Sequence, residues 1–257
     1  MDFGITGKKA LITGAGRGLG RAITLALYNE GVKVAPISRT KSDLENLTNE
    51  IGGKENGNYT ISCDLSKYDS PRKVIEELLD NGFGYPDILV NNVGGTLDIK
   101  NPFCSIEDWR KILRLNLEVT IELSNLVIPY MKEKQWGRIV NISSISSKEN
   151  QGPVTYCTAK AALNAYTRSM GRFLAPEGIV MSEVLPGAVF TEGGYWDTVS
   201  KTNPEQAKKY VDERMAIKRF GTPEEIASIV TFLCSKQSSF CIGSAFPADG
   251  GQAKCFY

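Results

Sequence analysis

Short apolar runs alternate with helix-length amphipathic segments along almost all of the 257 residues. The runs read KKALIT, VKVAPIS, YTISCD, DILVNNVG, RIVNISS, IVMSEVLPG and SAFPADGG. Strands separated by helical segments pair in parallel with helices on both faces, and strands covered on both sides are apolar on both sides. The alternation predicts an α/β fold: a doubly wound, Rossmann-type seven-stranded parallel sheet in a single domain over residues 1–257.

Two prolines fall inside the predicted strands. Pro36 removes a hydrogen-bond donor from the second strand, whereas Pro247 is tolerated if the last strand lies at an edge of the sheet. The longest stretch without a strand contains a predicted helix near Glu205–Met215. We expect this insertion, about residues 190–215, to be a lid over the substrate site.

Composition excludes several classes of function. Thirty basic residues balance twenty-nine acidic ones, so charge gives no argument for nucleic acid or a membrane surface. No apolar run reaches the eighteen or so residues of a membrane helix, and the N-terminus lacks the apolar stretch of a signal peptide. We expect a cytoplasmic protein.

The chain contains no histidine, and its six cysteines are scattered without a C-x-x-C pair. A zinc site would need an all-cysteine or carboxylate set, and no such cluster is present in the sequence, so no metal is expected. The absence of histidine also excludes Ser-His and Cys-His nucleophiles.

A glycine-rich segment, TGAGRGLG, follows the first strand and opens the first helix. Gly14, Gly18 and Gly20 permit a tight turn and allow the backbone to approach a ligand without an intervening Cβ. The helix that follows offers free N–H groups and the positive end of its dipole to a diphosphate. Placed between the first strand and the first helix, this segment predicts a dinucleotide site.

Several motifs in a fixed order resemble those of the short-chain dehydrogenase/reductase family. They are TGAGRGLG, the Asp64-Leu65 pair of CDLS, NNVG from Asn91 to Gly94, Asn116 in LRLNLEV, NISS, YCTAK, PGAVFT from Pro186 to Thr191, RFGTPEEIA and DGG. The resemblance implies a catalytic set of Asn116, Ser144, Tyr156 and Lys160. It implies cofactor contacts from Gly14, Arg17, Gly18, Leu19, Gly20, Ser38, Arg39, Asp64, Leu65, Asn92, Gly94, Tyr156, Lys160, Pro186, Gly187, Val189 and Thr191.

Tyr156 and Lys160 are four residues apart, which places them one above the other on a helix. A free tyrosine, with a pKa of about 10, is a poor base at neutral pH; lowering that pKa by roughly three units requires about 4 kcal/mol of preferential stabilisation of the phenolate. The lysine, together with a bound nicotinamide, is expected to supply it. The tyrosine would then carry the proton while a hydride moves to or from a carbonyl carbon.

A second hydrogen-bond donor should stabilise the developing oxyanion, and the resemblance implies that a serine at the end of the fifth strand has this role. Ser143 and Ser144 are both candidates; Ser144 is preferred because a shift of one residue would reverse the face of the side chain. The resemblance further implies that Lys160 binds the nicotinamide ribose and that Asn116 holds a water. The alternative for Asn116 is a core amide that bends its helix.

The end of the second strand, PISRT, predicts NADP(H) rather than NAD(H). Ser38 stands where an acidic residue would grip the ribose 2′-hydroxyl of NAD. Arg39 follows it, and Arg17 lies in the glycine turn, so two cations are available for a 2′-phosphate. The alternative is that both arginines are solvated surface residues.

The predicted reaction interconverts a ketone or aldehyde and an alcohol on a small molecule. Thr96, Ser144, Tyr195 and Trp196 are the candidate substrate contacts, and packing of the two aromatic residues between lid and core is an equal alternative. Charges in the lid favour a polar substrate, such as a sugar derivative or hydroxy acid; they are Glu192, Asp197, Lys201 and Lys208.

Two other functions stay open at this point. One is 3-oxoacyl-carrier-protein reduction, for which Lys132, Lys134 and Arg138 could form a basic rim and Glu177 would weaken it. The other is a non-catalytic dinucleotide-binding regulator. Glu183, beside the cofactor strand, is costly to bury unless it is paired, and the sequence does not show whether it contacts substrate or a cation. The resemblance also implies a homotetramer, or a homodimer, assembled through helices 106–131 and 155–175.

Overall fold

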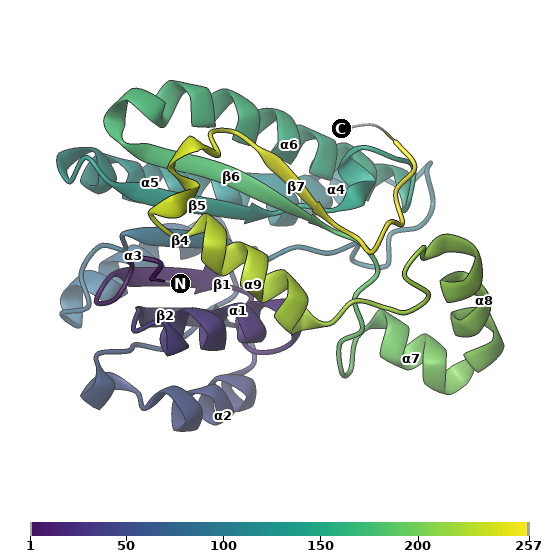
Figure 1. Cartoon of the computed structure of the whole chain (residues 1–257), viewed down its shortest axis with the longest axis horizontal. Helices are drawn as coiled ribbons and strands as arrows, with labels where there is room; N and C mark the ends of the chain where they lie inside the picture. The colour runs from purple at the N-terminus through teal and green to yellow at the C-terminus, as the bar shows by residue number, and fades with distance from the viewer. Residues whose placement is uncertain (1, 256–257) are drawn as a thin grey trace.

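Seven parallel strands form one sheet in the order β3-β2-β1-β4-β5-β6-β7 (Figure 1). The computed structural model describes residues 2–255. The strands are β1 (Lys9–Thr13), β2 (Lys33–Ser38), β3 (Ile61–Ser62), β4 (Ile88–Asn91), β5 (Gly137–Ile142), β6 (Ile179–Pro186) and β7 (Ala245–Ala248). The order reverses between β1 and β4, as in a doubly wound sheet, so the predicted fold class is confirmed.

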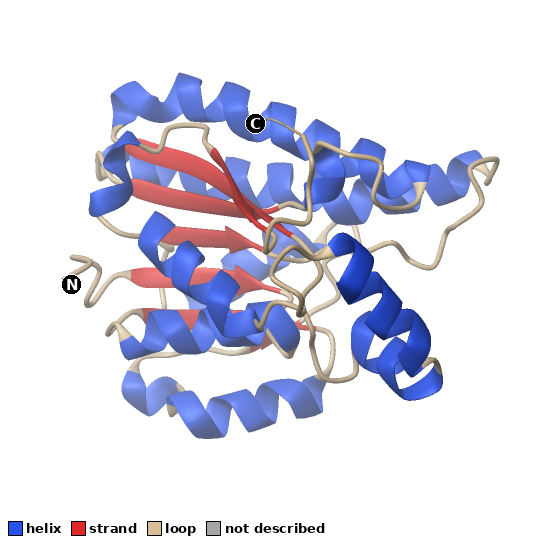
Figure 2. Ribbon diagram, turned by 45° about the vertical axis from the view of Figure 1, so that its right-hand side comes forward, coloured by secondary structure: helices blue, strands red, loops and turns tan. Residues whose placement is uncertain are grey.

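Helices cover both faces of this sheet (Figure 2). The helices of the described chain are α1 (Gly18–Asn29), α2 (Lys41–Ile51), α3 (Ser70–Asp80), α4 (Ile106–Leu113), α5 (Val119–Glu133), α6 (Val154–Leu174), α7 (Tyr195–Thr202), α8 (Pro204–Arg214) and α9 (Pro223–Leu233), of which α7 and α8 lie beyond the ends of the strands. Apolar residues of α1, α2 and α9 pack on one face, and those of α3, α5 and α6 pack on the other. The strands are therefore buried on both sides, as their continuous apolar runs predict.

Pro36 explains why the neighbouring edge strand is short. The N–H of Val34 points toward that edge, where it donates to the side chain of Asn58 at 2.8 Å. Pro36, two residues later, faces the same side and has no N–H to offer. Regular pairing begins only beyond it, where Ile37 pairs with Ile61. At the opposite edge, β7 pairs with β6 alone, and this position accommodates Pro247 as predicted.

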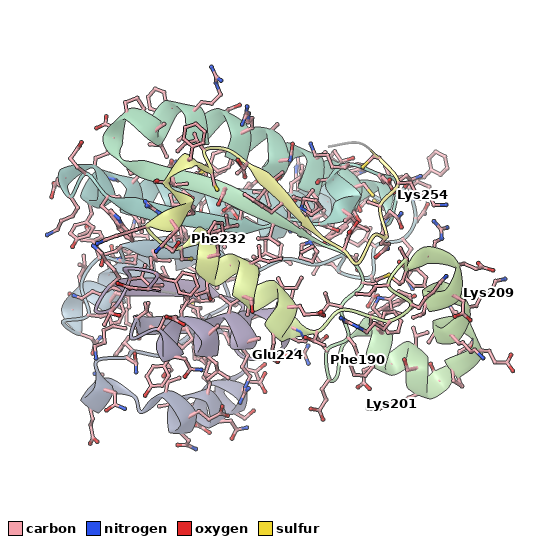
Figure 3. All side chains as sticks on the ribbon, in the orientation of Figure 1. Phe190, Lys201, Lys209, Glu224, Phe232 and Lys254 are labelled. Atoms are coloured by element: carbon pink, nitrogen blue, oxygen red, sulfur yellow. The ribbon has the colours of Figure 1, made fainter. Side chains whose placement is uncertain are left out.

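Helices α7 and α8 form a hairpin that projects beyond the carboxyl ends of the strands (Figure 1). The helix predicted near Glu205–Met215 is confirmed as α8. An aromatic cluster holds the hairpin: the ring centroid of Trp196 lies 4.1 Å from that of Tyr210 and 4.8 Å from that of Phe220. Lys201 and Lys209 point away from the sheet (Figure 3).

Within residues 2–255, no helix is both long enough and apolar enough to cross a membrane.

Candidate active site

A groove runs along the carboxyl ends of the strands, the usual ligand position in an open α/β sheet. It consists of three adjoining hollows of about 220, 440 and 600 Å³. The first two share Gly14, Arg17, Asn92 and Gly94 in their walls. The second and third share Ser144, Tyr156, Tyr195 and Trp196 among others. Segments far apart in the sequence therefore meet in one continuous site.

The glycine-rich segment forms the wall between the first two hollows. Helix α1 begins at Gly18, and no side chain caps its N-terminus, so its first N–H groups remain available to a ligand. A Cβ added at Gly20 would stand 2.2 Å from the carbonyl oxygen of Gly14, so only glycine allows the turn to close this tightly. Asn92 fixes the turn to β4 by donating to the carbonyls of Thr13 and Gly14 at 3.0 and 3.1 Å.

The first hollow has the charges suited to the adenosine end of a dinucleotide. Ser38, Arg39, Asp64 and Leu65 line it, and Arg17 reaches it from the glycine turn. Burial works to raise the pKa of Asp64, but hydrogen bonds from Ser66 and the charges of Arg39 and Lys67 outweigh it and lower the pKa. Neither Arg17 nor Arg39 forms an ion pair within residues 2–255, so both guanidinium groups are available to a phosphate.

Sequence reasoning missed Asp43, which also lines this hollow. It lies in the first turn of α2 and approaches the glycine turn closely: a Cβ added at Gly16 would be 2.9 Å from the Cβ of Asp43. No sequence motif marks it, because only the packing of α2 against the glycine turn brings it there.

Tyr156 and Lys160 lie on the same face of α6, one turn apart, in the wall of the second hollow. The ammonium nitrogen of Lys160 is 5.7 Å from the centroid of the Tyr156 ring. It donates a hydrogen bond of 2.8 Å to the carbonyl of Ile142 at the end of β5, which aims the buried lysine at the groove. The pair is thus assembled as the helical spacing predicts.

The expected acidification of Tyr156 does not occur in the chain by itself. Burial raises the pKa of this tyrosine to about 12, and the nearby hydroxyl of Ser144 opposes the rise. Lys160 is not the dominant influence on it, because burial also lowers the lysine's own pKa, to about 8. The expected acidification, which includes the charge of a bound nicotinamide, stays a prediction: in the chain by itself Tyr156 holds its proton and can act as an acid.

The structure separates the two candidate serines. Ser144 lines the second and third hollows, and its hydroxyl lies beside the phenol of Tyr156. Ser144 also caps a short 3-10 turn by accepting a hydrogen bond from the N–H of Ser146 at 3.1 Å, which fixes its rotamer. Ser143 also borders the second hollow, but it is 4% exposed and its hydroxyl lies near Glu183, whereas the hydroxyl near Tyr156 is that of Ser144. This geometry favours Ser144.

Asn116 lies outside the groove wall and supports it from behind. It occupies a π-helical turn, Arg114–Glu118, of the kind that frequently marks functional sites. Its amide donates to the carbonyls of Gly95 and Ile112 at 2.9 and 3.0 Å and accepts from the N–H of Gly95 at 3.0 Å. A Cβ at Gly94 would stand 2.8 Å from the Asn116 oxygen and 3.2 Å from the Lys160 nitrogen, so this glycine permits their close approach.

The third hollow adjoins Tyr156; most of the surface that lines it is apolar, and polar side chains stand among its aromatic and aliphatic groups. Thr96, Tyr195 and Trp196 line it, as predicted for a substrate site. Glu192, Asp197, Lys201 and Lys208 do not, so the lid charges give no argument about the substrate. The carboxylate of Asp197, for example, forms an ion pair with the ammonium of Lys201 at 2.8 Å. The polar lining comes instead from other residues, which sequence reasoning missed: Asp98, Lys100, Gln151, Gln206, Tyr210 and Gln252.

Most of the predicted contacts line the groove. These are Gly14, Arg17, Gly18, Leu19, Ser38, Arg39, Asp64, Leu65, Asn92, Gly94, Tyr156, Lys160, Pro186, Gly187, Val189 and Thr191. Gly20 and Asn116 are buried behind the wall of the groove. Gly20 allows close approach to Gly14, and Asn116 holds Gly95 by hydrogen bonds. Within residues 2–255, no three cysteine, aspartate or glutamate side chains gather in a way that could hold a metal ion.

The first two hollows fit a dinucleotide. An uncapped helix N-terminus and a turn with no room for a Cβ lie at their junction, which suits a diphosphate. Two unpaired arginines stand at one end, and a proton donor with a buried ammonium stands at the other. A groove of this kind, ending at a tyrosine–lysine pair, defines a nicotinamide-dependent oxidoreductase.

Comparison with known proteins identifies the family. A family model described as enoyl-(acyl carrier protein) reductase matches residues 14–253. The 3-oxoacyl-(acyl-carrier-protein) reductase FabG of Aquifex aeolicus is 35% identical over 256 residues, covering 98% of this chain and 99% of that protein. L-xylulose reductase of Bos taurus is 33% identical over 255 residues, covering 98% of each. The chain therefore belongs to the short-chain dehydrogenase/reductase family.

A solved structure agrees with this assignment. L-sorbose reductase of Gluconobacter frateurii, complexed with NADPH and L-sorbose, superposes with a TM-score of 0.89 at 28% identity and full coverage of both chains. The chain is accordingly an oxidoreductase that interconverts a carbonyl and an alcohol, and not the non-catalytic dinucleotide-binding protein that the sequence left open.

Proposed function

We propose that this enzyme uses NADP(H), in preference to NAD(H), to reduce a small polar ketone. The observation that carries the proposal is the continuous groove: two unpaired arginines at one end, Tyr156 and Lys160 near the other, and beyond them a hollow of about 600 Å³. The complexes of related reductases with NADPH or NADP support the choice of cofactor.

Arg17 and Arg39 would hold the 2′-phosphate, and Asp64 and Leu65 would flank the adenine. A guanidinium is suited to a phosphate through its charge and its fork of donors. The turn at Gly14 and Gly18 would hold the diphosphate. The negative charge of Asp43 would repel a phosphate, but the two positive charges of Arg17 and Arg39 line the same hollow and exceed it. The same hollow offers no carboxylate at position 38, where NAD-specific enzymes grip the ribose.

When bound beside Tyr156, NADPH supplies the hydride for reduction of the carbonyl carbon. Tyr156 donates its proton to the carbonyl oxygen, and its raised pKa keeps that proton in place until the substrate arrives. Ser144, beside the phenol, donates a hydrogen bond to the same oxygen as negative charge develops on it. Lys160 then stabilises the phenolate that remains and offers its other N–H groups to the ribose. Asn116 holds the Gly94–Gly95 segment close to Lys160 through its hydrogen bonds with Gly95. We propose that Asn116 also binds a water molecule next to Lys160.

Tyr210, on α8, is a candidate donor to a second polar group of the substrate. The N–H of Ala188 donates to the side-chain oxygen of Gln252 at 2.7 Å, which fixes how the Gln252 amide is turned. Its nitrogen therefore donates to the hydroxyl oxygen of Tyr210, also at 2.7 Å. The hydroxyl hydrogen of Tyr210 has no acceptor within residues 2–255 and is free for a ligand in the third hollow. Helices α7 and α8 would then form the substrate lid.

A ketone with a hydroxyl or carboxylate several bonds from its carbonyl fits this arrangement. L-xylulose and L-sorbose, the sugars in the names of two relatives, are such ketones. The test is NADPH consumption with L-xylulose, L-sorbose and cyclohexanone, with Tyr156→Phe as the control. We expect turnover of the hydroxyketones, weak turnover of cyclohexanone and loss of both in the variant. Activity that survives Tyr156→Phe would contradict the mechanism.

Reduction of a 3-oxoacyl group on a carrier protein is the second candidate, because the FabG relatives match nearly the full chain. Of the three cations considered for a basic rim, Lys134 is exposed, whereas the other two are engaged within the chain. Arg138 is 3% exposed and stacks on Trp136, and Lys132 is paired with Glu177 at 3.2 Å. Adding an acetoacetyl-carrier protein to the same panel tests this candidate directly: a higher kcat/KM for it than for the sugars would favour it.

We also propose a cytoplasmic homotetramer. Exposed apolar side chains lie beside or on α4 and α6, among them Phe103, Ile106 and Phe173, and their burial between copies would stabilise an assembly. Light scattering measures the assembly, and a monomer at micromolar concentration would contradict it.

A further inference from the structure

Glu183 lies in the middle of β6 and is only 1% exposed. It completes a row of polar side chains across the sheet, in register with Asn141 on β5 and Asn91 on β4. Asn91 donates to Asn141 at 2.9 Å, and Asn141 donates to Thr167 on α6 at 2.8 Å, so the row faces α6. A carboxylate at the end of this row is buried directly beneath the helix that carries the active pair.

The partners of Glu183 do not fully satisfy its carboxylate. One oxygen accepts a hydrogen bond from the amide of Asn164 on α6. The other has no hydrogen-bond partner within residues 2–255. The hydroxyl of Ser143 lies near enough to favour the charged form, without the geometry of a full hydrogen bond. Burying a carboxylate in this way is costly, so we looked for the group that it affects.

That group is Lys160. Asn164 is one helical turn beyond Lys160, which is itself one turn beyond Tyr156. The three side chains therefore form a stripe along α6, and Glu183 reaches this stripe at the end away from the tyrosine. Lys160 is 3% exposed, and its one hydrogen bond within residues 2–255 goes to the neutral carbonyl of Ile142. Burial lowers the pKa of Lys160 to about 8, and the charge of Glu183 opposes that fall.

Few charges surround the carboxylate. Lys160 faces it from α6, and Lys148, which is exposed and lies 3.4 Å from the Asn164 oxygen, faces it from the segment after β5. Strands β5 and β7 bring only uncharged groups near it. Burial raises the pKa of Glu183 to about 7. The carboxylate therefore becomes negative over the same pH range in which the buried ammonium would otherwise begin to lose its proton.

We propose that Glu183 is a positioning residue that acts through Lys160: its carboxylate keeps the ammonium charged and in place above neutral pH, and so sets the alkaline limit of catalysis. The proposal rests on the role proposed above for Lys160. It also gives a function to a carboxylate that touches neither hollow of the dinucleotide groove nor the substrate hollow.

The test is the pH profile of kcat from pH 6 to pH 10 for the wild type and Glu183→Gln, which keeps the shape and removes the charge. Loss of one opposing charge is worth on the order of one pKa unit to a buried neighbour, so we expect the alkaline limb to move about one pH unit toward neutral. With a lysine pKa of about 8 in the wild type, activity should then fall about ninefold at pH 9 and about twofold at pH 7. Glu183→Asp should restore the limb in part, and Glu177→Gln, at an exposed pair, should leave it in place.

Affinity for NADPH, measured by its fluorescence over the same pH range, provides a readout that does not require turnover. Because Lys160 is expected to hold the ribose, affinity in Glu183→Gln should weaken at a lower pH than in the wild type. Asn164→Ala removes the hydrogen bond to the Glu183 carboxylate and should move the pH profiles of kcat and of NADPH affinity in the same direction as Glu183→Gln, but by a smaller amount. This variant replaces Glu183→Gln in the test if Glu183→Gln fails to fold.

Superimposable profiles for Glu183→Gln and the wild type would overturn the proposal, as would an equal loss at every pH. If activity is still abolished by Lys160→Met while Glu183→Gln changes nothing, the proposed function stands and this inference fails. If no carbonyl is reduced by the wild type, the proposed function fails, and the NADPH-binding profile still decides whether Glu183 acts on Lys160.

Discussion

Replacement of Glu183 by glutamine should make the stability of the enzyme less sensitive to alkaline pH. Burial raises the pKa of this carboxyl from the ordinary value of 4.5 to about 7. The folded chain therefore keeps a proton that the unfolded chain releases. The stability that the carboxyl contributes is complete below pH 4.5 and is lost as the pH rises through 7.

The size of the effect follows from that shift. Moving the pKa from 4.5 to about 7 corresponds to about 3.4 kcal/mol in full, of which about 2.5 kcal/mol develops between pH 5 and pH 8. For 257 residues the entropy of unfolding is about 0.5 kcal/mol/K, so the difference in Tm between Glu183→Gln and the wild type should grow by about 5 °C over this interval.

Differential scanning calorimetry of both proteins at pH 5, 6, 7 and 8 measures this difference. Glu177→Gln is the matched control, because its carboxyl is exposed and its pKa is lowered by Lys132 rather than raised. A Tm difference for Glu183→Gln that stays constant from pH 5 to pH 8 would refute the reasoning, since it would mean that the carboxyl does not titrate differently in the folded chain.

Four further substitutions probe the groove. Arg39→Ala should raise the KM for NADPH on the order of tenfold and leave that for NADH unchanged, whereas Asp43→Asn should lower the KM for NADPH a few-fold; equal effects on both cofactors would contradict the assignment of the phosphate site. Tyr210→Phe should raise the KM for a hydroxyketone about fivefold with little change in kcat, and an unchanged KM would exclude the contact. Gly94→Ala should destabilise the fold by about 1–3 kcal/mol in urea unfolding, because the added methyl stands 2.8 Å from the Asn116 oxygen; a variant as stable as the wild type would show that this segment relaxes freely.

Local spacing made much of the fold and of the catalytic pair predictable. Strands buried on both faces must be apolar throughout, and a helix must place Tyr156 one turn from Lys160. Both relations involve residues close in the sequence. The preference for Ser144 likewise depended on the alternation of a single strand, and the neighbouring serine indeed lies on the other side of the backbone, near Glu183.

The residues that escaped prediction are those brought together by tertiary contacts. Gln252 lies 42 residues from Tyr210 and 101 from Gln151, and only the docking of the C-terminal segment beside α8 joins them. Arg138 seemed available as a surface cation, but its place in a central strand buries it, and it donates instead to the carbonyl of Ser235 at 2.8 Å. The fall of Tyr156's pKa was predicted from the charges of Lys160 and a bound nicotinamide without counting desolvation, and burial is the largest influence on both side chains.

The two proposed roles, of Glu183 in pH dependence and of Tyr210 in substrate binding, belong to residues on opposite sides of Tyr156. Glu183 and Asn164 meet Lys160 from the interior, along the axis of α6, and none of the three lines the substrate hollow. Tyr210 and Gln252 approach that hollow from the lid and the C-terminal segment, and they do not touch Lys160. Residues that share no partners contribute to function nearly independently. If both proposals hold, we expect substitutions at Tyr210 to change the KM for the substrate without moving the pH profile, and substitutions at Glu183 to move the pH profile without changing the choice of substrate.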